Sequence, residues 1–470
     1  KKLYEPPLLE EMKQRFESVR YAFNLGGDKP FMQDYEGFEC KSKPIEWLLI
    51  GAPTDNTIEK NRDHFFKRDT VSNMCPSCCS TALFTMQTNA PMGGPGYRTS
   101  IRGGGPLTTL ILSDKTFDTL WQLVWLNVLE EKIFCTLCNA ARNTPAEIFP
   151  WLAKYRHQVT AQDIHPAQLF WAMPRRIRLN LDKLVTGRCD VCASESNQLI
   201  TRYREVNKGT EYLAPVKHHL SPYDSRKGKG VLGQSGGVGY RHWLGFVVPD
   251  RNNSIYPAVI VHEFVNVRKK EEWQFRLWAF VYDMESIKAQ CWYDAKMPLI
   301  TVSDELIAKY EDTIASLIKA SIIICGNVKI AIKRVLHGIP EYDSITRQIK
   351  WKYKDIKRLH ADEEKARVRI LNSTSDVSLF MAVEAFFWQK TEQHFYSTLN
   401  NIMRTAKNDE PHLIFLEGWH HVLCSEALQQ FDAHMLNGPI EDVDIKKASL
   451  ARKELNDFNK GTFVRTLLGL

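Results

Sequence analysis

Six of the eleven cysteines in this chain occur as three CxxC pairs, the spacing with the most specific chemistry in the sequence. The pairs are Cys75-Pro-Ser-Cys78, Cys135-Thr-Leu-Cys138 and Cys189-Asp-Val-Cys192. Two intervening residues let both thiolates of a pair face one ion from a tight turn, and two pairs complete a tetrahedral zinc site. We therefore expect one closed, structural metal site, with redox-active or simply buried cysteines as the alternative. The spacing alone does not decide which pair is left over.

A glycine-rich segment is the second candidate for chemistry. Six glycines lie between Asn89 and Pro106, together with Arg98 and Arg102. Glycine lets the backbone approach a ligand closely and exposes N–H groups, while arginine side chains bind phosphates. The chain carries no P-loop, HExxH or zinc-deaminase signature. The segment therefore predicts either a nucleic-acid loop or a structural turn region.

The bulk composition is that of a globular protein. The 470 residues predict two to four domains, and contents of 44% hydrophobic and 25% charged residues allow a packed core. The net charge of +7 fits a protein that binds nucleic acid, and it fits equally an ordinary protein with a solvated charged surface. Without a secretory signal, the CxxC pairs indicate a reducing compartment. We expect no membrane span, and we expect an N-terminal segment to be missing because the chain begins at Lys1 without methionine.

The elements that must position these residues differ between the two parts of the chain. Residues 1–298 are mixed, and strands are expected at Leu107–Leu112, Tyr256–His262 and Trp273–Val281. Residues 299–470 are helical in pattern. Helices are expected from Ser303 to Leu336, from Ser375 past Met403, from Leu413 to Leu436 and from Asp442 to Leu468, with a solvated connection over Arg347 to Arg369. The fold class is therefore α+β: a large mixed N-terminal domain with a structural zinc site, followed by a C-terminal four-helix bundle.

Short motifs along nearly the whole chain share the order of those in one known family. In chain order they are Lys29-Pro-Phe31-Met32-Gln33, Asp63 to Arg68, Cys75 to Cys78, Gln87 to Pro91, Arg102 to Thr109, Met173 to Arg178, Gly239 to Trp243, Trp278-Ala-Phe280, Tyr282-Asp-Met284 and Lys288 to Tyr293. The joint pattern resembles the large subunit, the CasA family, of the type I-E CRISPR Cascade complex.

The resemblance implies the roles of particular residues. Zinc would be bound by Cys75, Cys78, Cys189 and Cys192, which leaves Cys135 and Cys138 as the spare pair. The protospacer-adjacent motif of duplex DNA would be read by a glycine loop (Met92, Gly93, Gly94, Pro95, Gly96), a lysine finger near Asn207 and Lys208, and a wedge at Glu285, Ser286 and Ile287. Residues Phe65, Phe66 and Lys67 match a loop that contacts the CRISPR RNA.

The function implied by the resemblance is DNA recognition without catalysis. Such a subunit of a prokaryotic, cytoplasmic antiviral complex binds the motif in double-stranded target DNA and wedges the strands apart to start the R-loop. Its partners would be CRISPR RNA, the other Cascade subunits and a helicase-nuclease that it helps recruit. Two alternatives stay open, a zinc-dependent nuclease and a zinc-ribbon scaffold that binds RNA. The His262-Glu263 and His420-His421 pairs are expected to be surface or satisfied core residues rather than ligands.

Overall fold

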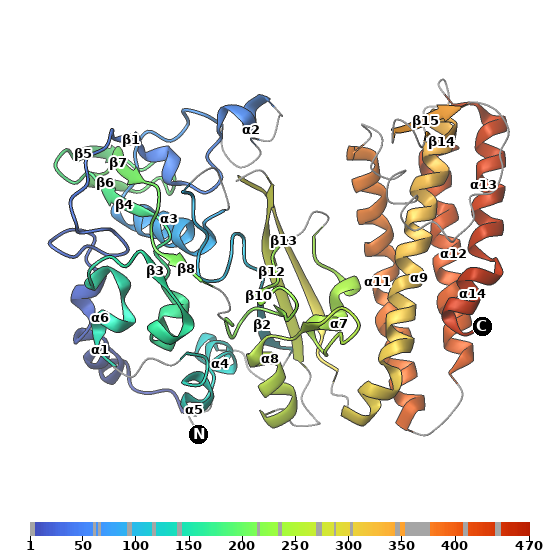
Figure 1. The fold of residues 1–470 in the computed structure, drawn as a ribbon, viewed down its shortest axis with the longest axis horizontal. Helices are drawn as coiled ribbons and strands as arrows, with labels where there is room; N and C mark the ends of the chain where they lie inside the picture. The colour runs from blue at the N-terminus through green and yellow to red at the C-terminus, as the bar shows by residue number, and fades with distance from the viewer. Residues whose placement is uncertain are drawn as a thin grey trace. The chain divides into compact units, whose positions relative to one another are not determined.

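The chain folds into two compact units, each described by itself (Figure 1). The N-terminal unit comprises Lys1–Val238 and Gly245–Leu299, and the helical unit comprises Gly239–Leu244 and Ile300–Leu470. The structure, a computed structural model, describes residues 5–59, 63, 67–91, 96–114, 119–138, 143–213, 217–233, 237–268, 275–285, 288–300, 304–343, 348–352, 377–407, 412–437 and 443–470.

The N-terminal unit combines short helices with small sheets. Its helices are α1 (Leu9–Glu17), α2 (Asp55–Glu59), α3 (Pro76–Asn89), α4 (Leu120–Leu126), α5 (Glu131–Phe134), α6 (Pro145–Ile148) and α8 (Val259–Glu263). Its strands are β1 (Lys43–Pro44), β2 (Thr108–Ser113), β3 (Gln158–Val159), β4 (Arg176–Leu179), β5 (Val185–Arg188), β6 (Glu195–Leu199), β7 (Arg202–Val206), β8 (Glu211–Tyr212), β9 (Tyr223–Asp224), β10 (Lys229–Gly230), β11 (Ile255–Tyr256), β12 (Phe275–Glu285) and β13 (Lys288–Pro298). The helix α7 (Trp243–Phe246) begins in the helical unit and ends in this one.

A small sheet and helix α3 surround the core that carries the cysteine pairs. The sheet has the strand order β1-β7-β4, and all its pairings are antiparallel. Side chains from α3, including Leu83, pack with Ile177 and Leu179 of β4 and with Tyr203 of β7. The thiols of Cys75 and Cys189 belong to the same hydrophobic cluster. The cysteine pairs are therefore anchored by core packing on both sides.

A second sheet, of order β13-β12-β2, confirms two of the expected strands. Along β12, the alternate residues Phe275, Leu277, Ala279 and Val281 are buried, which is the period-2 pattern that the sequence predicts. Strands β12 and β13 form a hairpin with an irregularity in register at Asp283 and Met284. The hairpin tip lies between Glu285 and Lys288.

The expected strand at Tyr256–His262 is wrong. Only Ile255 and Tyr256 pair as strand β11, and residues from Val259 onward form helix α8. Ile260 and Val261 are both fully buried. A short, continuously apolar run is compatible with either element when it is buried on all sides, so its periodicity could not distinguish them.

The helical unit consists mainly of long helices that lie side by side (Figure 1). They are α9 (Asp304–His337), α11 (Val377–Lys407), α12 (Leu413–Met435), α13 (Ile445–Asn459) and α14 (Thr462–Leu468). Helix α9 packs against each of the other four. The expected stretch from Asp442 to Leu468 divides into two helices, because Gly461 is the N-cap at which α14 begins.

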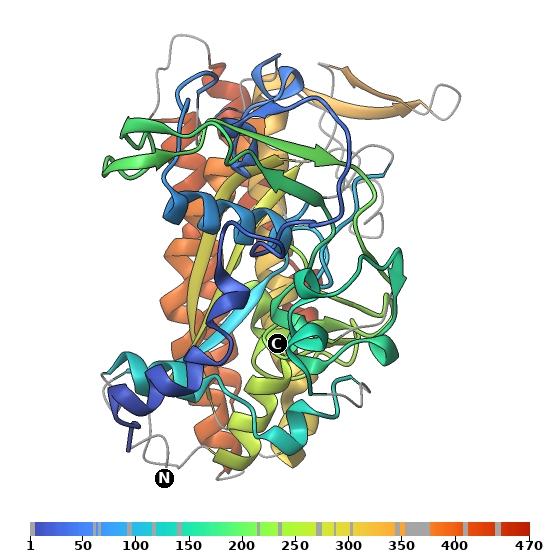
Figure 2. The same ribbon diagram turned by 90° about the vertical axis from the view of Figure 1, so that its left-hand side faces the viewer.

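A hairpin follows α9 where part of a solvated connection was expected. Its strands are β14 (Ile339–Asp343) and β15 (Gln348–Lys352), and Figure 2 shows them extending from the helices in orange. The rest of the expected connection, residues 353–369, lies outside the described residues.

A short segment far from the long helices in sequence belongs to their core. Tyr240 is fully buried, shares a hydrogen bond with the hydroxyl of Thr391 at 2.9 Å, and stacks on Phe395 with ring centroids 4.5 Å apart. Next to it, Arg241 forms an ion pair with Glu384 at 2.8 Å. Residues 239–244 are therefore a packing element of the helical unit.

One helix has the length and hydropathy that a membrane span would need. The stretch Tyr310–His337 of α9 has a mean hydropathy of 1.6 in its most apolar window, but 61% of that window is buried inside the structure. Burial of Leu317, Ile324 and Val328 against neighbouring helices is typical of a core helix in a soluble protein. The helix is therefore weak evidence for a membrane span.

Candidate metal centre and nucleic-acid interface

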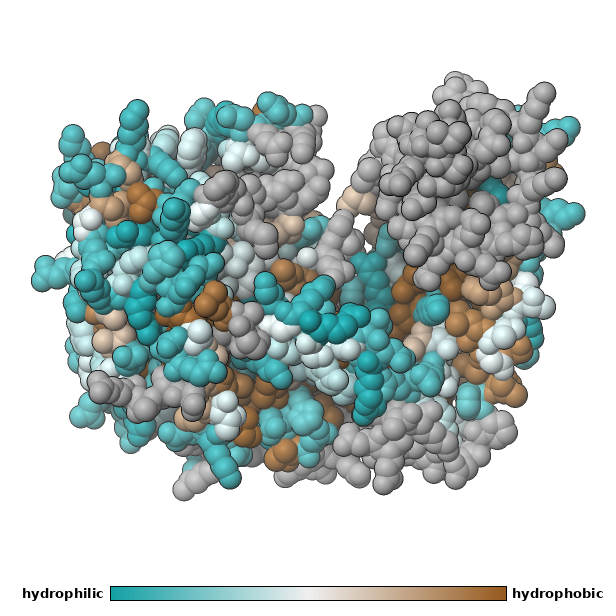
Figure 3. Space-filling view, in the orientation of Figure 1, coloured by the Kyte–Doolittle hydropathy of each residue, from teal (hydrophilic) through white to brown (hydrophobic). Residues whose placement is uncertain are grey.

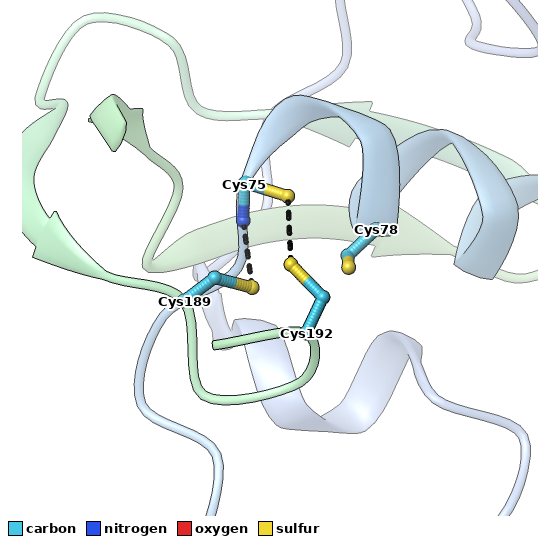
Figure 4. Close-up of side chains that lie close together, drawn as sticks. All are labelled: Cys75, Cys78, Cys189 and Cys192. Carbon is cyan, nitrogen blue, oxygen red and sulfur yellow. Dashed lines mark hydrogen bonds between the residues drawn. The ribbon is translucent and has the colours of Figure 1, made fainter. Parts of the chain in front are cut away.

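Four cysteines that are distant in sequence converge on one point (Figure 4). The Sγ atoms of Cys75, Cys78, Cys189 and Cys192 all lie within 4.8 Å of one another. Cys75 Sγ and Cys192 Sγ lie 3.7 Å apart, although the two residues are 117 positions apart in the chain. A disulfide would need about 2.05 Å, so these are four free thiols.

The first cysteine pair is positioned by the start of helix α3. Cys75 is the N-cap, and Pro76 occupies the first turn, where its missing N–H costs no helical hydrogen bond. Cys78 follows in that turn, so both sulfurs lie at the positive end of the helix dipole. This end stabilises negative charge and so opposes the effect of burial, which raises the pKa of Cys78.

The second pair lies on the turn between β5 and β6. The turn is closed by hydrogen bonds from Cys189 N to Ser194 O and from Ala193 N to Cys189 O, both 2.9 Å long. Ala193 has a positive φ of 61°. The Asp190 carboxylate accepts from the backbone of Ser72 at 2.7 Å, which ties the turn to the residues before α3. This hydrogen bond therefore helps to bring the two CxxC turns, here called the two knuckles, close together.

The four thiols fit a tetrahedral thiolate-bound ion. With metal–sulfur bonds of about 2.3 Å, a tetrahedral zinc site places sulfurs about 3.8 Å apart. The 3.7 Å between Cys75 and Cys192 agrees with this spacing, and the remaining pairs lie within 4.8 Å. The cluster is thus able to hold a metal ion with four sulfur ligands.

The surroundings of the cluster distribute protons unequally among the thiols. Burial, and then hydrogen bonding with Cys192 and Cys75, raises the pKa of Cys78 well above its ordinary value. In contrast, hydrogen bonds from the side chain and backbone of Ser194 lower the pKa of Cys192 to about 6. A metal ion displaces thiol protons when it binds such a cluster, so metal uptake there releases protons.

The third CxxC pair is not part of this cluster. Cys135 caps the end of α5 and is exposed, whereas Cys138 is buried with Ile164 and Leu169 in a separate hydrophobic cluster. Burial raises the pKa of Cys138 to about 11, which is typical of a core thiol. Cys79, next to the first pair, is a core residue whose Sγ faces Met74 O at 3.8 Å.

The glycine loop and the lysine turn meet at their backbones. Met92, Gly93, Gly94 and Pro95 lie outside the described residues, but Gly96 is described. The backbone N–H of Lys208 donates to Gly96 O at 2.8 Å. Gly96 has a φ of +83°, and a Cβ there would lie 3.0 Å from Asn207 Cβ and 3.1 Å from Lys208 Cγ. Two segments more than one hundred residues apart thus form one surface.

The turn that presents Lys208 is held in place by contacts with Tyr155 and Pro174. It follows strand β7, and Lys208 itself has a positive φ of 67°. The hydroxyl of Tyr155 donates to Lys208 O at 2.6 Å. A Cβ on Gly209 would lie 2.3 Å from the backbone of Pro174, so only glycine allows this close approach. Both Asn207 and Lys208 are exposed, and no hydrogen bond or ion pair of Lys208 Nζ is found in the described part of the chain.

The buried Arg175 holds both ends of the glycine loop. Its Nη2 donates to Pro91 O at 2.8 Å, immediately before the loop. Its guanidinium lies 4.4 Å from the ring centroid of Tyr97, immediately after the loop. Gln87 on α3 exchanges two hydrogen bonds with the backbone of Arg175. Because α3 also begins at the cysteine cluster, the metal centre and the loop base share one helix.

Arg98 and Arg102 do not offer the phosphate contacts that the sequence suggested. Arg98 donates to Gly209 O at 2.6 Å and forms an ion pair with Glu211 at 3.3 Å. Arg102 donates to Thr108 Oγ1 and Ser221 Oγ, both at 2.8 Å. Burial lowers the pKa of Arg102 to about 10. Both arginines hold the protein's own backbone and loops, so the available cation beside the glycine loop is Lys208.

The remaining expected site residues are only partly described. The backbone of Glu285 ends β12 and pairs with Lys288, so the expected wedge falls at the tip of the β12–β13 hairpin; Ser286 and Ile287 lie outside the described residues. Phe65 and Phe66 also lie outside them. Lys67 is exposed and forms an ion pair with Asp63 at 2.7 Å.

Sequence reasoning missed the residues that support the site. Arg175 lies in the motif Met173 to Arg178, for which the sequence indicated no role at the site. Tyr155 and Gly209 carried no motif signal. A pair of arginines where a half-buried strand begins, as at Arg175 and Arg176, is a signal that could have indicated a buried clamp.

Comparisons with known proteins identify the family. The model of the family described as CRISPR-associated protein Cse1 matches residues 1–430. A structure of Thermus thermophilus CasA, also named Cse1, is similar with a TM-score of 0.54 at 14% identity, covering 98% of this chain and 83% of that one. Cse1 from Acidimicrobium ferrooxidans gives a TM-score of 0.54 at 13% identity, covering 100% and 84%.

A chain of a CRISPR RNA-guided surveillance complex gives a TM-score of 0.57 at 14% identity, covering 96% of this chain and 82% of that one. At such identities the structural likeness shows a shared fold, and the family match over most of the sequence shows the relationship. The resemblance to the CasA family that the motifs indicated is confirmed. This chain belongs to the CRISPR-associated Cse1 family.

Proposed function

We propose that this protein is the non-catalytic subunit of an RNA-guided antiviral complex that reads the protospacer-adjacent motif in duplex DNA. It acts in the prokaryotic cytoplasm together with CRISPR RNA and other Cascade subunits. Its family supports a role in CRISPR interference. The finer assignment, motif reading, rests on the residues around the glycine loop.

The observation that carries the proposal is the meeting of Gly96 and Lys208. Gly96, the last residue of the glycine loop, lies against a turn that presents the exposed Lys208, and Arg175 holds Pro91 just before the loop. The minor groove of DNA offers a degenerate pattern of donors and acceptors. Backbone N–H groups and one lysine suit such a groove, because they demand little of the base sequence while the lysine binds phosphate or an acceptor at the base edge.

Strand separation would follow motif binding. The tip of the β12–β13 hairpin, with Glu285, Ser286 and Ile287, acts as the wedge in this proposal. Opening a base step costs a few kcal/mol, which is offset when the guide RNA pairs with the target strand. Phe65, Phe66 and Lys67 would contact the CRISPR RNA, and the helical unit would help to recruit the helicase-nuclease.

We propose zinc as the metal of the four-cysteine cluster. Four thiolates in tetrahedral arrangement are the typical ligand set of structural zinc. The ion would supply no chemistry of its own beyond cross-linking the two knuckles. The ion would affect DNA binding through helix α3, because Cys75 is the N-cap of this helix and its last residue, Asn89, lies shortly before the glycine loop in the chain.

Exposed apolar side chains on the long helices support assembly with partners. Ile322, Met381, Phe386 and Ile414 are between 44% and 72% exposed. On the face drawn in Figure 3, hydrophobic residues gather over part of the helical unit. Apolar side chains that gather on a surface mark contact sites in multi-subunit complexes.

The two rival functions fit the site less well. A zinc-dependent nuclease needs an open coordination position for water, and a four-thiolate site is closed. A zinc-ribbon scaffold for RNA would not require a lysine held against the glycine loop. Incubation of the purified chain with DNA and Mg²⁺ or Mn²⁺ tests the first rival directly, since cleavage by the chain alone would overturn the proposal.

The exposed Lys208 of the lysine turn is the residue that we expect to contribute a charge to DNA binding. We expect Lys208→Ala to weaken binding of the assembled complex to motif-bearing duplex by roughly tenfold, because one groove contact and one phosphate charge are lost. The slope of log affinity against log salt concentration should fall by about one. Filter binding over a salt series measures both quantities.

Two further variants make the Lys208 test specific. Lys13→Ala removes a lysine of α1 that is 61% exposed and should leave DNA affinity unchanged. Asn207→Ala should have a smaller effect than Lys208→Ala. If Asn207→Ala is the damaging change, the contact residue is Asn207, and if neither variant alters affinity, the lysine turn does not read DNA.

A further inference from the structure

The β12–β13 hairpin has an unusual outer face. Its inner face is formed by buried residues such as Leu277, Ala279 and Val281. The opposite face of an antiparallel sheet is usually polar where it meets solvent. Here it carries aromatic residues instead, at Trp278, Phe280, Tyr282 and Trp292, and none of the four is buried.

The four rings form a continuous row. Trp278 and Phe280 have ring centroids 4.8 Å apart, Phe280 and Trp292 lie 5.3 Å apart in a stacked arrangement, and Trp292 and Tyr282 lie 4.8 Å apart. From Trp278 to Tyr282 the strand covers on the order of 14 Å. The Trp292 side chain, on the edge strand β13, is the most accessible of the four, and the residue is 43% exposed.

Charged residues border the row. In the strand register, Lys296 lies opposite Trp278, and Asp294 lies opposite Phe280. Asp294 is engaged, because it accepts from the indole N–H of Trp278 at 3.0 Å. Arg276 at the end of the row pairs with Asp114. Lys296 is exposed, and no ion pair of this lysine is found among the described residues, so a cation is available beside the rings.

A linear row of rings with a neighbouring cation matches single-stranded nucleic acid more closely than a protein partner. Bases stack on aromatic rings whatever their sequence, and cations follow the phosphates. A protein hot spot is instead a compact group of anchors surrounded by contacts that exclude water. The row here follows one strand and ends towards the tip between Glu285 and Lys288, where the proposed function separates the two DNA strands.

We infer that the row Trp278, Phe280, Tyr282 and Trp292 is a stacking platform for single-stranded DNA, namely bases unpaired next to the motif. The inference rests on the proposed function for which DNA strand is bound. That bases stack on these rings is inferred from the ring geometry alone. The rings bind bases by their faces, and Lys296 neutralises a phosphate. Holding the unpaired bases would oppose re-annealing after the wedge has opened the duplex.

The test uses the assembled complex and Trp292→Ala, with three DNA probes. The probes are a fully paired motif-bearing duplex, the same duplex with a mismatched bubble beside the motif, and single-stranded oligothymidine. We expect Trp292→Ala to lose about tenfold in affinity for the bubble and for oligothymidine, and to bind the paired duplex as the wild type does. Trp292→Tyr, which keeps a stacking ring, should restore most of the lost affinity.

The matched control is Trp47→Ala, because Trp47 is also a half-exposed tryptophan, at 46%. It should bind all three probes like the wild type. Unchanged bubble and oligothymidine affinity in Trp292→Ala would overturn the platform, and so would failure of the Trp292→Ala chain to assemble, which indicates a protein contact. Failure of the proposed function would look different: bubble affinity would depend on Trp292 but not on the presence of the motif.

Discussion

Replacing Cys189 by serine is expected to remove the bound metal and to lower the thermal midpoint of unfolding by on the order of 10 °C. A metal that joins Cys78 to Cys189 closes a loop of about one hundred residues, and a cross-link of that length contributes about 4–5 kcal/mol on a chain-entropy model. Cys189 is also 1% exposed, so its replacement disturbs the core cluster around Leu199 and Tyr203. Calorimetry with metal analysis of the same sample measures the midpoint and the metal content together.

Cys135→Ser is the matched control for this experiment. Cys135 also belongs to a CxxC pair, but it is exposed and lies outside the four-thiol cluster. We expect a change of less than about 0.5 kcal/mol in its free energy of unfolding, and an unchanged metal content. A Cys189→Ser protein that keeps one metal ion per chain, or that unfolds at the wild-type temperature, would contradict the structural role of the cluster.

Replacing Gly96 by valine is expected to abolish motif-dependent DNA binding while leaving complex assembly intact. The left-handed φ of +83° costs a residue with a side chain about 1–2 kcal/mol. In addition, the Cβ would press on Asn207 and Lys208 at 3.0 and 3.1 Å and displace the lysine turn. We expect the affinity for motif-bearing duplex to fall at least about tenfold.

Gly37→Val is the control for the glycine loop. A Cβ on Gly37 meets no heavy atom within 4 Å, and its φ is not in the left-handed range. This variant should assemble and bind DNA as the wild type does. Size-exclusion chromatography of each complex separates a defect in assembly from a defect in binding. Wild-type motif affinity in Gly96→Val would rule out the loop and the lysine turn as one surface.

The parts of the fold that were predictable from the sequence are those with a clear period. Helix α9 was expected because apolar residues recur every three to four positions from Leu306 onward. Strand β12 was expected because apolar and polar residues alternate along it. The strand expected at Tyr256–His262 was wrong because a short, continuously apolar run has no period that distinguishes a strand from a helix. The attachment of Tyr240 to the helical core was not visible either, because a contact across 151 residues leaves no local signal.

The residue types of the candidate site were predictable from the sequence. The contacts that hold these residues in place were not. Cysteine spacing indicated a metal site, yet only the fold shows that Cys138 is a core residue and that the other two pairs meet. Arginines near the glycines looked available for phosphate, but Arg102 is consumed by internal hydrogen bonds. The positive φ of Lys208 depends on tertiary contacts, such as the hydroxyl of Tyr155, that no propensity encodes.

The metal centre and the DNA-reading surface are linked by one helix in this account. Cys75 is the N-cap of helix α3, which ends at Asn89. Gln87 of this helix binds the backbone of Arg175, and Arg175 contacts both ends of the loop. Loss of the metal should therefore weaken motif reading as well as stability. In the proposed function the metal would therefore support recognition by fixing the start of this helix.

The central claim is that this chain supplies motif reading to its complex. The most direct measurement compares the affinity of the assembled complex, with and without this chain, for a motif-bearing duplex and for one with the motif scrambled. The account predicts a preference of at least about tenfold for the motif when the chain is present, and equal affinity for both duplexes when it is omitted. A preference that persists in the complex lacking this chain would contradict it.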